Sequence, residues 1–169
     1  MLKSIQKIAF GGGCHWCTEA VFQSIIGVEK VEQGYVASTG EHSGFSEAVI
    51  LHFNPEIVPL KRIIEIHLYT HKSTSNHSMR QKYRSAVYAY SASQLESSKD
   101  IIDRFQPDFN FKIITQVYPF KSFKTSRDEL LNYYKNDPEK PFCKTFIDPK
   151  LKLILEQFSE NIDPNIKGS

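Results

Sequence analysis

The sequence is poor in cysteine, in long apolar runs and in charge of one sign. Three cysteines in 169 residues are too few for a disulfide scaffold, and in a reducing compartment they are more often catalytic than structural. No apolar run is long enough to cross a membrane, and residues 1–10 hold no signal-peptide core, so we expect a cytoplasmic protein without a membrane partner. The net charge is +2 and the basic residues are scattered, which gives no indication of nucleic-acid binding.

The remaining composition is that of an ordinary globular protein. Hydrophobic residues make up 40% of the chain and charged residues 24%. The length suits one domain with a sizeable core, and no repeat, low-complexity tract or linker divides the chain. We therefore expect a single domain over residues 1–169, with a frayed tail over residues 161–169.

Strand and helix patterns mix along the chain without strict βαβ repetition. We expect strands over residues 5–10, 28–36, 45–53, 84–90 and 111–118. Helices are expected up to Gly27, over residues 60–68, from Ser91 or Ser93 to Phe105, from Thr125 or Ser126 to Tyr134, and from Pro149 to about Phe158. This order predicts the α+β class, as a two-layer sandwich with helices packed on a mixed or antiparallel sheet.

The stretch GGGCHWCTE, residues 11–19, lies between a predicted strand and a predicted helix. Glycines allow the sharp turn, so Cys14 falls at a helix N-terminus, where free N–H groups and the helix dipole favour the attacking thiolate. The alternatives are an inert buried cysteine pair and a zinc site, which would need Cys143 and scattered histidines to reach about four ligands. The agreement of strand, turn, cysteine and helix favours a reactive thiol, and we expect no metal.

Several other side chains could act with Cys14. Glu47 lies mid-strand in an apolar run; buried near Cys14, it would stay protonated and could donate a proton, whereas the alternative places it on the open face of the sheet. Tyr35 and Tyr83 each lie beside a strand end, where a hydroxyl could reach a ligand oxygen. Trp16 could wall an apolar pocket. Each aromatic residue could equally serve packing alone.

The histidines give weaker indications. His15 is adjacent to Cys14, but neighbouring residues on a helix point apart, which disfavours a dyad of the two. His67 and His71 have the four-residue spacing of one helix face, but no nearby carboxylate completes a metal site. We expect core or surface roles for both.

Over nearly its whole length the chain resembles the A-type peptide methionine sulfoxide reductases. The resemblance begins with GCHWCTEAVF at residues 13–22 and continues through the Glu47 strand and YRS at residues 83–85. Toward the end it includes DPEKPFC at residues 137–143, Ile147 and PKL at residues 149–151. The chain departs from the family at His15, where Phe is usual, at Ser78, where Asp is usual, and at Leu130, where His is usual. The resemblance implies a ferredoxin-like fold and a catalytic role for the single domain.

The resemblance implies thiol-dependent reduction of methionine S-sulfoxide, free or in proteins, to methionine. Cys14 would attack the sulfur. A sulfoxide oxygen is a poor leaving group, so Glu47 would protonate it while Tyr35 and Tyr83 bind the same oxygen. Loss of methionine would leave Cys14 as a sulfenic acid, which a second thiol converts to a disulfide.

Trp16, with His15 in place of the family's Phe, would enclose the substrate methyl group. The resemblance also implies recycling by thioredoxin or a similar dithiol donor, and we expect a monomer without a cofactor. Two other functions stay open: a general CxxC thiol-disulfide oxidoreductase, and a degenerate family member that binds oxidised methionine without turnover. The departures from the family at Ser78 and Leu130 are the reason to consider binding without turnover.

Cys17 and Cys143 are the two candidates to resolve the sulfenic acid of Cys14. Cys17 is one helical turn away and needs no loop closure, whereas Cys143 requires the segment after Pro138 to move. We therefore predict Cys14–Cys17 as the first disulfide, with Cys143 as a second relay or a bystander. The measurement is peptide mapping under non-reducing conditions after one equivalent of sulfoxide. A dominant Cys14–Cys143 cross-link, with Cys17→Ser still recycling at full rate, would reverse the choice.

Overall fold

The computed structural model describes residues 5–12, 15–70, 84–126, 148–158 and 161. In chain order its elements are β1 (Gln6–Gly11), α1 (His15–Gln23), β2 (Val28–Ala37), the 3-10 helix η1 (Gly40–His42), β3 (Ser46–Phe53), α2 (Leu60–Thr70), β4 (Ala86–Ala89), α3 (Ala92–Phe105), the 3-10 helix η3 (Gln106–Asp108), β5 (Gln116–Pro119), β6 (Ser122–Thr125) and α5 (Asp148–Gln157). The α+β class expected from the sequence is confirmed. No helix within these ranges is long and apolar enough to cross a membrane.

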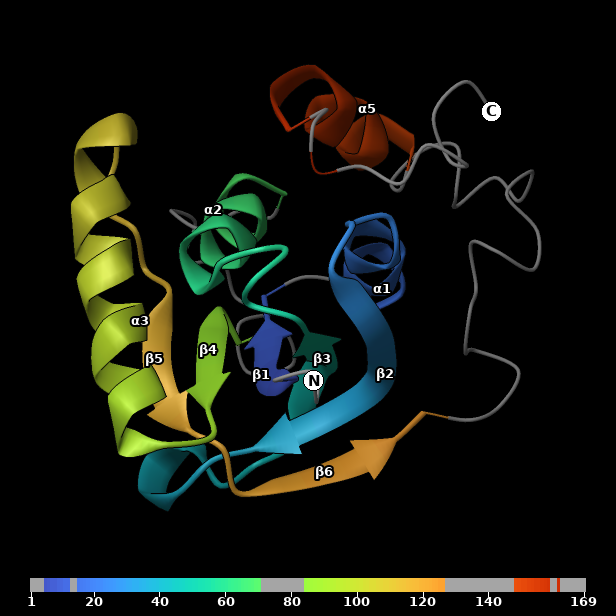
Figure 1. The fold of residues 1–169 in the computed structure, drawn as a ribbon. Helices are drawn as coiled ribbons and strands as arrows, with labels where there is room; N and C mark the ends of the chain where they lie inside the picture. Colours follow the sequence, from blue (N-terminus) through green and yellow to red (C-terminus); the bar gives the residue numbers. More distant parts are fainter. Residues whose placement is uncertain (1–4, 13–14, 71–83, 127–147, 159–160, 162–169) are drawn as a thin grey trace.

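The strands of the described residues form one curled, mixed sheet in the order β5-β4-β1-β3-β2-β6 (Figure 1). β1 pairs antiparallel with β3 and β4, β2 pairs antiparallel with β3 and β6, and β4 pairs parallel with β5. Because β1 lies between β3 and β4 and runs against both, its last residue, Gly11, sits beside Ala48 near the start of β3 and Ala86 at the start of β4. The ends of three strands therefore meet at one edge of the sheet.

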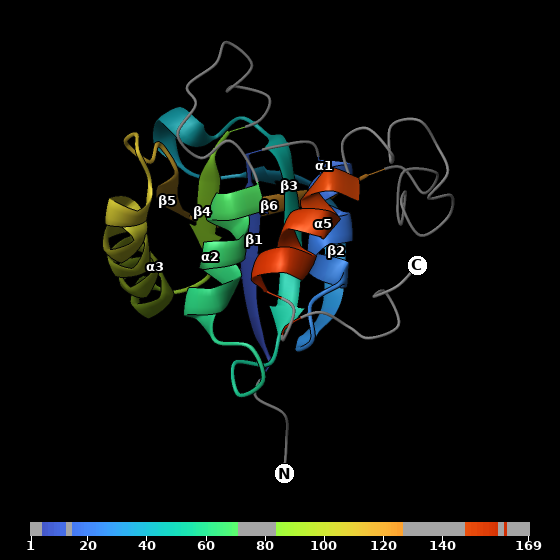
Figure 2. The same cartoon turned by 90° about the horizontal axis from the view of Figure 1, so that it is seen from above.

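The two faces of the sheet carry separate cores. On one face, apolar side chains of β1 and β3 pack with α1 and α2, and Phe10 stacks on Phe22 with ring centroids 5.3 Å apart. Alternate residues of the same strands, among them Ala48 and Ile50, point to the opposite face and pack with half-buried aromatic residues around β5 and β6. Helix α5 lies over α1 and α2 (Figure 2), and Phe158, just past its end, joins the first core.

Helix α1 ends earlier than the sequence indicates, at Gln23 rather than at Gly27. The N–H groups of Ser24 and Ile25 bond to carbonyls three residues back, which tightens the last turn and closes the helix. Gly27 has a φ of 98° and turns the chain into β2 instead. The expectation that this glycine ends the helix is therefore wrong.

The strand expected over residues 111–118 is also wrong in its first half, because β5 covers only Gln116–Pro119. The side chain of Gln106 hydrogen-bonds to the backbone of the loop before β5. Its Nε2 donates to the Phe111 carbonyl at 3.0 Å, and its Oε1 accepts from the Ile113 N–H at 2.8 Å. Those backbone groups thus bond to a side chain rather than to a neighbouring strand.

The expected cap at Ser91 is confirmed, since its Oγ accepts from the Gln94 N–H at 3.0 Å and starts α3. Thr125, in contrast, is the last residue of β6 and caps no helix. The helix expected from there to Tyr134 lies outside the described residues except for Ser126. Of the tail expected over residues 161–169, only residue 161 is described.

Gly34 of β2 lies where β6 comes closest. A Cβ at this position would collide with the carbonyl oxygen of Lys124 and lie 2.7 Å from the Phe123 ring. Gly34→Ala should therefore displace β6 and lower the free energy of unfolding by about 1–3 kcal/mol, the usual cost of overpacking. At Gly44 no described atom lies within 4 Å of such a Cβ, so Gly44→Ala should change stability by less than about 0.5 kcal/mol. Urea unfolding measures both changes, and equal losses would contradict the tight contact.

Candidate active site

The glycine turn before Cys14 begins where the three strand ends meet. A Cβ at Gly11 would lie 2.8 Å from the carbonyl oxygen of Arg84 and 3.1 Å from that of Glu47. Gly12 has a φ of 134°, which residues with a side chain rarely adopt. Both positions therefore need glycine, the first for close backbone approach and the second for its conformation.

Helix α1 begins at His15, so a strand precedes the glycine turn and a helix follows it, as the sequence predicts. The backbone of His15, Trp16 and Cys17 forms the first turn of this helix. Cys14 lies outside the described residues, as do Tyr83, Cys143 and the side chains of this first turn. The structure thus describes the elements on both sides of the predicted nucleophile.

Glu47 is the second residue of β3, and its side chain is buried, with 6% exposed. Strand alternation places it on the face of Val49 and Leu51, which pack in the same core as α1, so the open-face alternative is wrong. Its direct cross-strand partner in β2 is Tyr35. Such partners share a face and have Cβ atoms about 4.5–5.5 Å apart. Two predicted site residues therefore lie together on the α1 side of the sheet.

Arg84 joins the start of β4 to the loop before β3, and its role was not predicted from the sequence. Its guanidinium donates to the carbonyls of His42, at 2.8 Å, and of Gly44, while its backbone N–H donates to Ser46 Oγ at 2.8 Å. Ser46 directly precedes Glu47, so these bonds fix the start of β3. The position of Arg84 in the YRS motif was the available signal, but its partners lie far away in the chain.

The Arg84 guanidinium also lies over two aromatic rings, 5.7 Å from the Tyr88 centroid and 5.9 Å from the Tyr118 centroid. Burial raises the pKa of Tyr88 to about 12, and the Arg84 charge partly opposes this rise. Burial likewise raises the pKa of Tyr118. Both phenols therefore stay neutral near pH 7 and present ring faces to the cation. Since both rings belong to the opposite core, Arg84 supports the site from behind the sheet.

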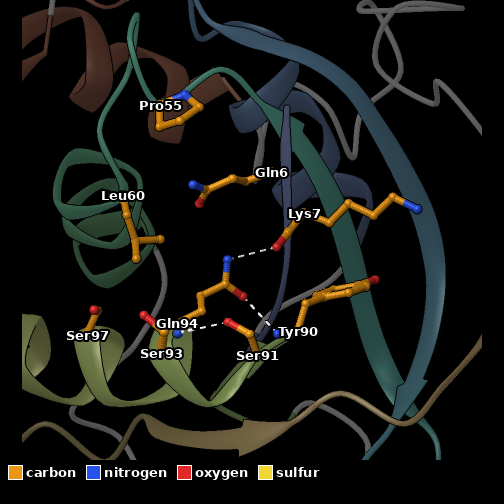
Figure 3. Close-up of a pocket in the computed structure, with 9 residues that line it drawn as sticks. All are labelled: Gln6, Lys7, Pro55, Leu60, Tyr90, Ser91, Ser93, Gln94 and Ser97. Carbon is orange, nitrogen blue, oxygen red and sulfur yellow. Dashed lines mark hydrogen bonds between the residues drawn. The ribbon is translucent and has the colours of Figure 1, made fainter. Parts of the chain in front are cut away.

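A pocket of about 420 Å³ lies at the other end of the sheet, beside the first residues of β1 (Figure 3). Gln94 crosses it, donating from Nε2 to the Lys7 carbonyl at 2.9 Å and accepting at Oε1 from the Tyr90 N–H at 2.8 Å. Figure 3 shows the Lys7 side chain pointing away from the cavity. The described lining, which holds no thiol or carboxylate, consists of Gln6, Lys7, Pro55, Leu60, Tyr90, Ser91, Ser93, Gln94 and Ser97.

Metal ligands do not gather in the part of the chain that the structure describes, where no three His, Cys, Asp or Glu side chains are placed to hold an ion. His67 is buried in α2, which confirms a core position, and its Nε2 contacts the Gly11 carbonyl oxygen at 2.9 Å. His71 lies outside the described residues.

Known proteins match the chain over most of its length. A family model described as peptide methionine sulfoxide reductase matches residues 6–162. The chain belongs to this family. The peptide methionine sulfoxide reductase MsrA of Deinococcus radiodurans is 30% identical, over 93% of this chain and 84% of the relative. The MsrA of a Psychrobacter species is 32% identical, over 92% of this chain and 98% of the relative.

Solved structures of one further protein share the fold. Mxr1 from Saccharomyces cerevisiae in reduced form has a TM-score of 0.74 at 21% identity, over 84% of this chain and 91% of that one. Mxr1 in complex with Trx2 has a TM-score of 0.61 at 23% identity, over 76% of this chain and 84% of that one. The family fold therefore extends to a chain in which His15 stands where the resemblance leads one to expect Phe.

Arg84→Gln should loosen the loop that Arg84 binds. A hydrogen bond to a charged group contributes about 1.5–3 kcal/mol when buried, and Arg84 is only partly buried, so we expect a loss of about 1–3 kcal/mol in the free energy of unfolding. Arg62→Gln is the control, because it removes a partly buried bond to Glu65 and a contact with the Phe158 ring, and should cost about 1 kcal/mol. Urea unfolding measures the free energy of unfolding of both variants. Equal losses would show that the bonds of Arg84 to the loop stabilise the fold no more than the contacts of Arg62 do.

Proposed function

We propose that this protein reduces methionine S-sulfoxide, free or within proteins, to methionine, with Cys14 as the attacking thiol. The observation that carries the proposal is the meeting of β1, β3 and β4 at one edge, beside the buried Glu47. Membership of the peptide methionine sulfoxide reductase family supports the reaction type.

Short chain connections and the backbone contacts at Gly11 keep the proposed groups close together. Cys14 follows Gly11 by three residues, and three extended residues span at most about 11 Å. The backbones of Glu47 and Arg84 both approach Gly11 closely, and Tyr83 directly precedes Arg84. These constraints support a single small site for Cys14, Glu47 and Tyr83.

In the proposed reaction, the Cys14 thiolate attacks the sulfoxide sulfur while the carboxylic acid of Glu47 protonates the oxygen. The oxygen passes to the Cys14 sulfur and methionine leaves. The methionine sulfur gains two electrons, and the Cys14 sulfur loses two and becomes a sulfenic acid. A second thiol, from Cys17 or Cys143, then attacks this sulfur, water leaves and a disulfide forms.

Tyr35 and Tyr83 would hold the sulfoxide oxygen as negative charge builds on it. The position of Tyr35 directly across from Glu47 supports this role. Trp16 and His15, both in the first turn of α1, would enclose the methyl group on the sulfur. A ring with nitrogen atoms at residue 15 makes this wall more polar than the family's usual phenylalanine.

The disulfide must be reduced before the next turnover. The complex of the structurally similar Mxr1 with Trx2 supports thioredoxin or a similar dithiol as the donor. The elements from β1 to β4 follow as β-α-β-β-α-β and pair as β4-β1-β3-β2, which supports a ferredoxin-like core. We propose that residues 1–169 act as one catalytic domain and as a monomer.

Cys14→Ser should abolish methyl sulfoxide reduction, because a serine hydroxyl is a poor nucleophile toward sulfur at neutral pH. Cys17→Ser and Cys143→Ser should each still support one stoichiometric turnover. A thioredoxin-coupled assay with both sulfoxide epimers measures these activities. Steady turnover by Cys14→Ser would show that another residue attacks, and reduction of insulin disulfides without sulfoxide reduction would favour a general thiol-disulfide oxidoreductase.

Glu47→Gln should slow the first turnover roughly 100- to 10,000-fold, because the amide cannot give a proton to the oxygen. The measurement is a single-turnover rate with pre-reduced protein. Glu32→Gln is the matched control, since Glu32 binds His52 Nε2 at 2.6 Å and pairs with Ile50 on the opposite face. A Glu47→Gln rate near that of Glu32→Gln would rule out general-acid catalysis by Glu47.

A further inference from the structure

His67 of α2 reaches the last residue of β1 from the helix side of the sheet. The side chain is 2% exposed, and its Nε2 lies 2.9 Å from the carbonyl oxygen of Gly11. Because a carbonyl oxygen only accepts, Nε2 carries the proton and donates in this bond. The imidazole also packs on the Phe10 ring, with centroids 4.5 Å apart, so it is held between α2 and β1.

The bonded carbonyl belongs to the peptide group that joins Gly11 to Gly12. A peptide group is planar, so fixing its oxygen restrains the dihedral angle on each side of it, ψ of Gly11 and φ of Gly12. Those two angles set the direction in which the chain leaves β1. Glycine populates positive and negative φ about equally, so the φ of 134° at Gly12 is allowed but not imposed by the residue. The bond from His67 restrains this freedom.

Folding alone gives little reason for a histidine at this position. A phenylalanine would also pack on Phe10 and would carry no polar atoms into the core. Burying a polar group costs free energy that its hydrogen bond roughly offsets, so the imidazole adds little net stability. What the imidazole provides and a hydrocarbon ring lacks is the bond to the turn that leads to Cys14.

We propose that His67 is a positioning residue for the Cys14 thiol. Its bond to the Gly11 carbonyl holds the glycine turn, and through it the nucleophile, at a fixed place relative to Glu47. This inference rests on the proposed function, in which Cys14 attacks the substrate sulfur. His67 acts only through the backbone and takes no part in the chemistry. Misplacing a reacting group by about 1 Å can lower a rate roughly 100-fold, so a single bond is enough to matter.

The test compares His67→Gln with His67→Met in the full chain carrying Cys17→Ser and Cys143→Ser, where Cys14 is the remaining thiol. The two side chains have similar lengths, but only the glutamine amide can donate to Gly11. The readouts are the alkylation rate of Cys14 by iodoacetamide and the single-turnover rate at saturating methyl sulfoxide. Glutamine should keep both rates within about threefold of those with His67. Methionine should slow both roughly 10- to 100-fold, because a displaced thiol loses the helix N-terminus that favours the thiolate and its place beside Glu47.

Thr70→Val in the same background is the matched control. Thr70 is also buried on α2, and its hydroxyl donates to the Ile66 carbonyl at 2.6 Å, so the change removes a buried bond that does not involve Gly11. It should lower the thermal midpoint and leave both rates unchanged. The proposal is overturned if His67→Met keeps both rates, if Gln and Met slow them equally, or if Thr70→Val slows them as much. Should His67→Met not fold, His67→Phe replaces it, because its ring packs on Phe10 and has no donor.

The alkylation readout separates the two proposals. If the chain with His67 intact reduces no sulfoxide but His67→Met still slows Cys14 alkylation, the proposed function fails and the positioning role stands. If sulfoxide reduction occurs and His67→Met alters neither rate, the positioning role fails and the proposed function stands.

Discussion

The antiparallel pairing of β1 with both β3 and β4 is the constraint on which the rest of the site depends. A strand flanked by two antiparallel neighbours ends where both of them begin, so the last residue of β1 meets the starts of β3 and β4. Gly11 makes this meeting close, because its missing side chain leaves room for the carbonyls of Arg84 and Glu47. The glycine turn before Cys14, the buried Glu47 and Arg84, which follows Tyr83, all lie at this one contact.

The two faces of the curled sheet hold different polar groups. The face under α1 and α2 holds the buried Glu47 and its cross-strand partner Tyr35. The opposite face holds the Arg84 guanidinium, which bonds to two loop carbonyls and lies over two neutral phenols. The cation is thus kept behind the sheet, away from the side chain proposed to give up a proton.

Sequence patterns correctly predicted the features that depend on residues close together in the chain. The glycine-rich stretch marked the strand-turn-helix order around Cys14, the apolar run marked the burial of Glu47, and Ser91 marked the start of α3. They failed where a partner distant in sequence decides the outcome. Strand β6 is an edge strand without apolar alternation, and it forms because β2 offers it backbone groups at Gly34.

The contacts of Arg84 and His67 show the same limit. Arg84 binds carbonyls of the loop before β3, and His67 binds the last carbonyl of β1. In both cases the acceptor is a backbone group, which no sequence pattern reveals. Backbone acceptors are present at every residue, so only the folded chain shows which one a buried donor reaches. Sequence reasoning therefore identified the candidate reacting groups but not the side chains that hold the backbone between them.

The most direct measurement of the central claim is a crystal structure of Cys14→Ser with a methyl sulfoxide bound. Convergence of the strand ends on one reaction site predicts that the sulfoxide oxygen lies about 2.6–3.2 Å from the Glu47 carboxyl group, with the sulfur facing residue 14. A bound sulfoxide whose oxygen points away from Glu47, or a binding site at the other end of the sheet, would contradict it.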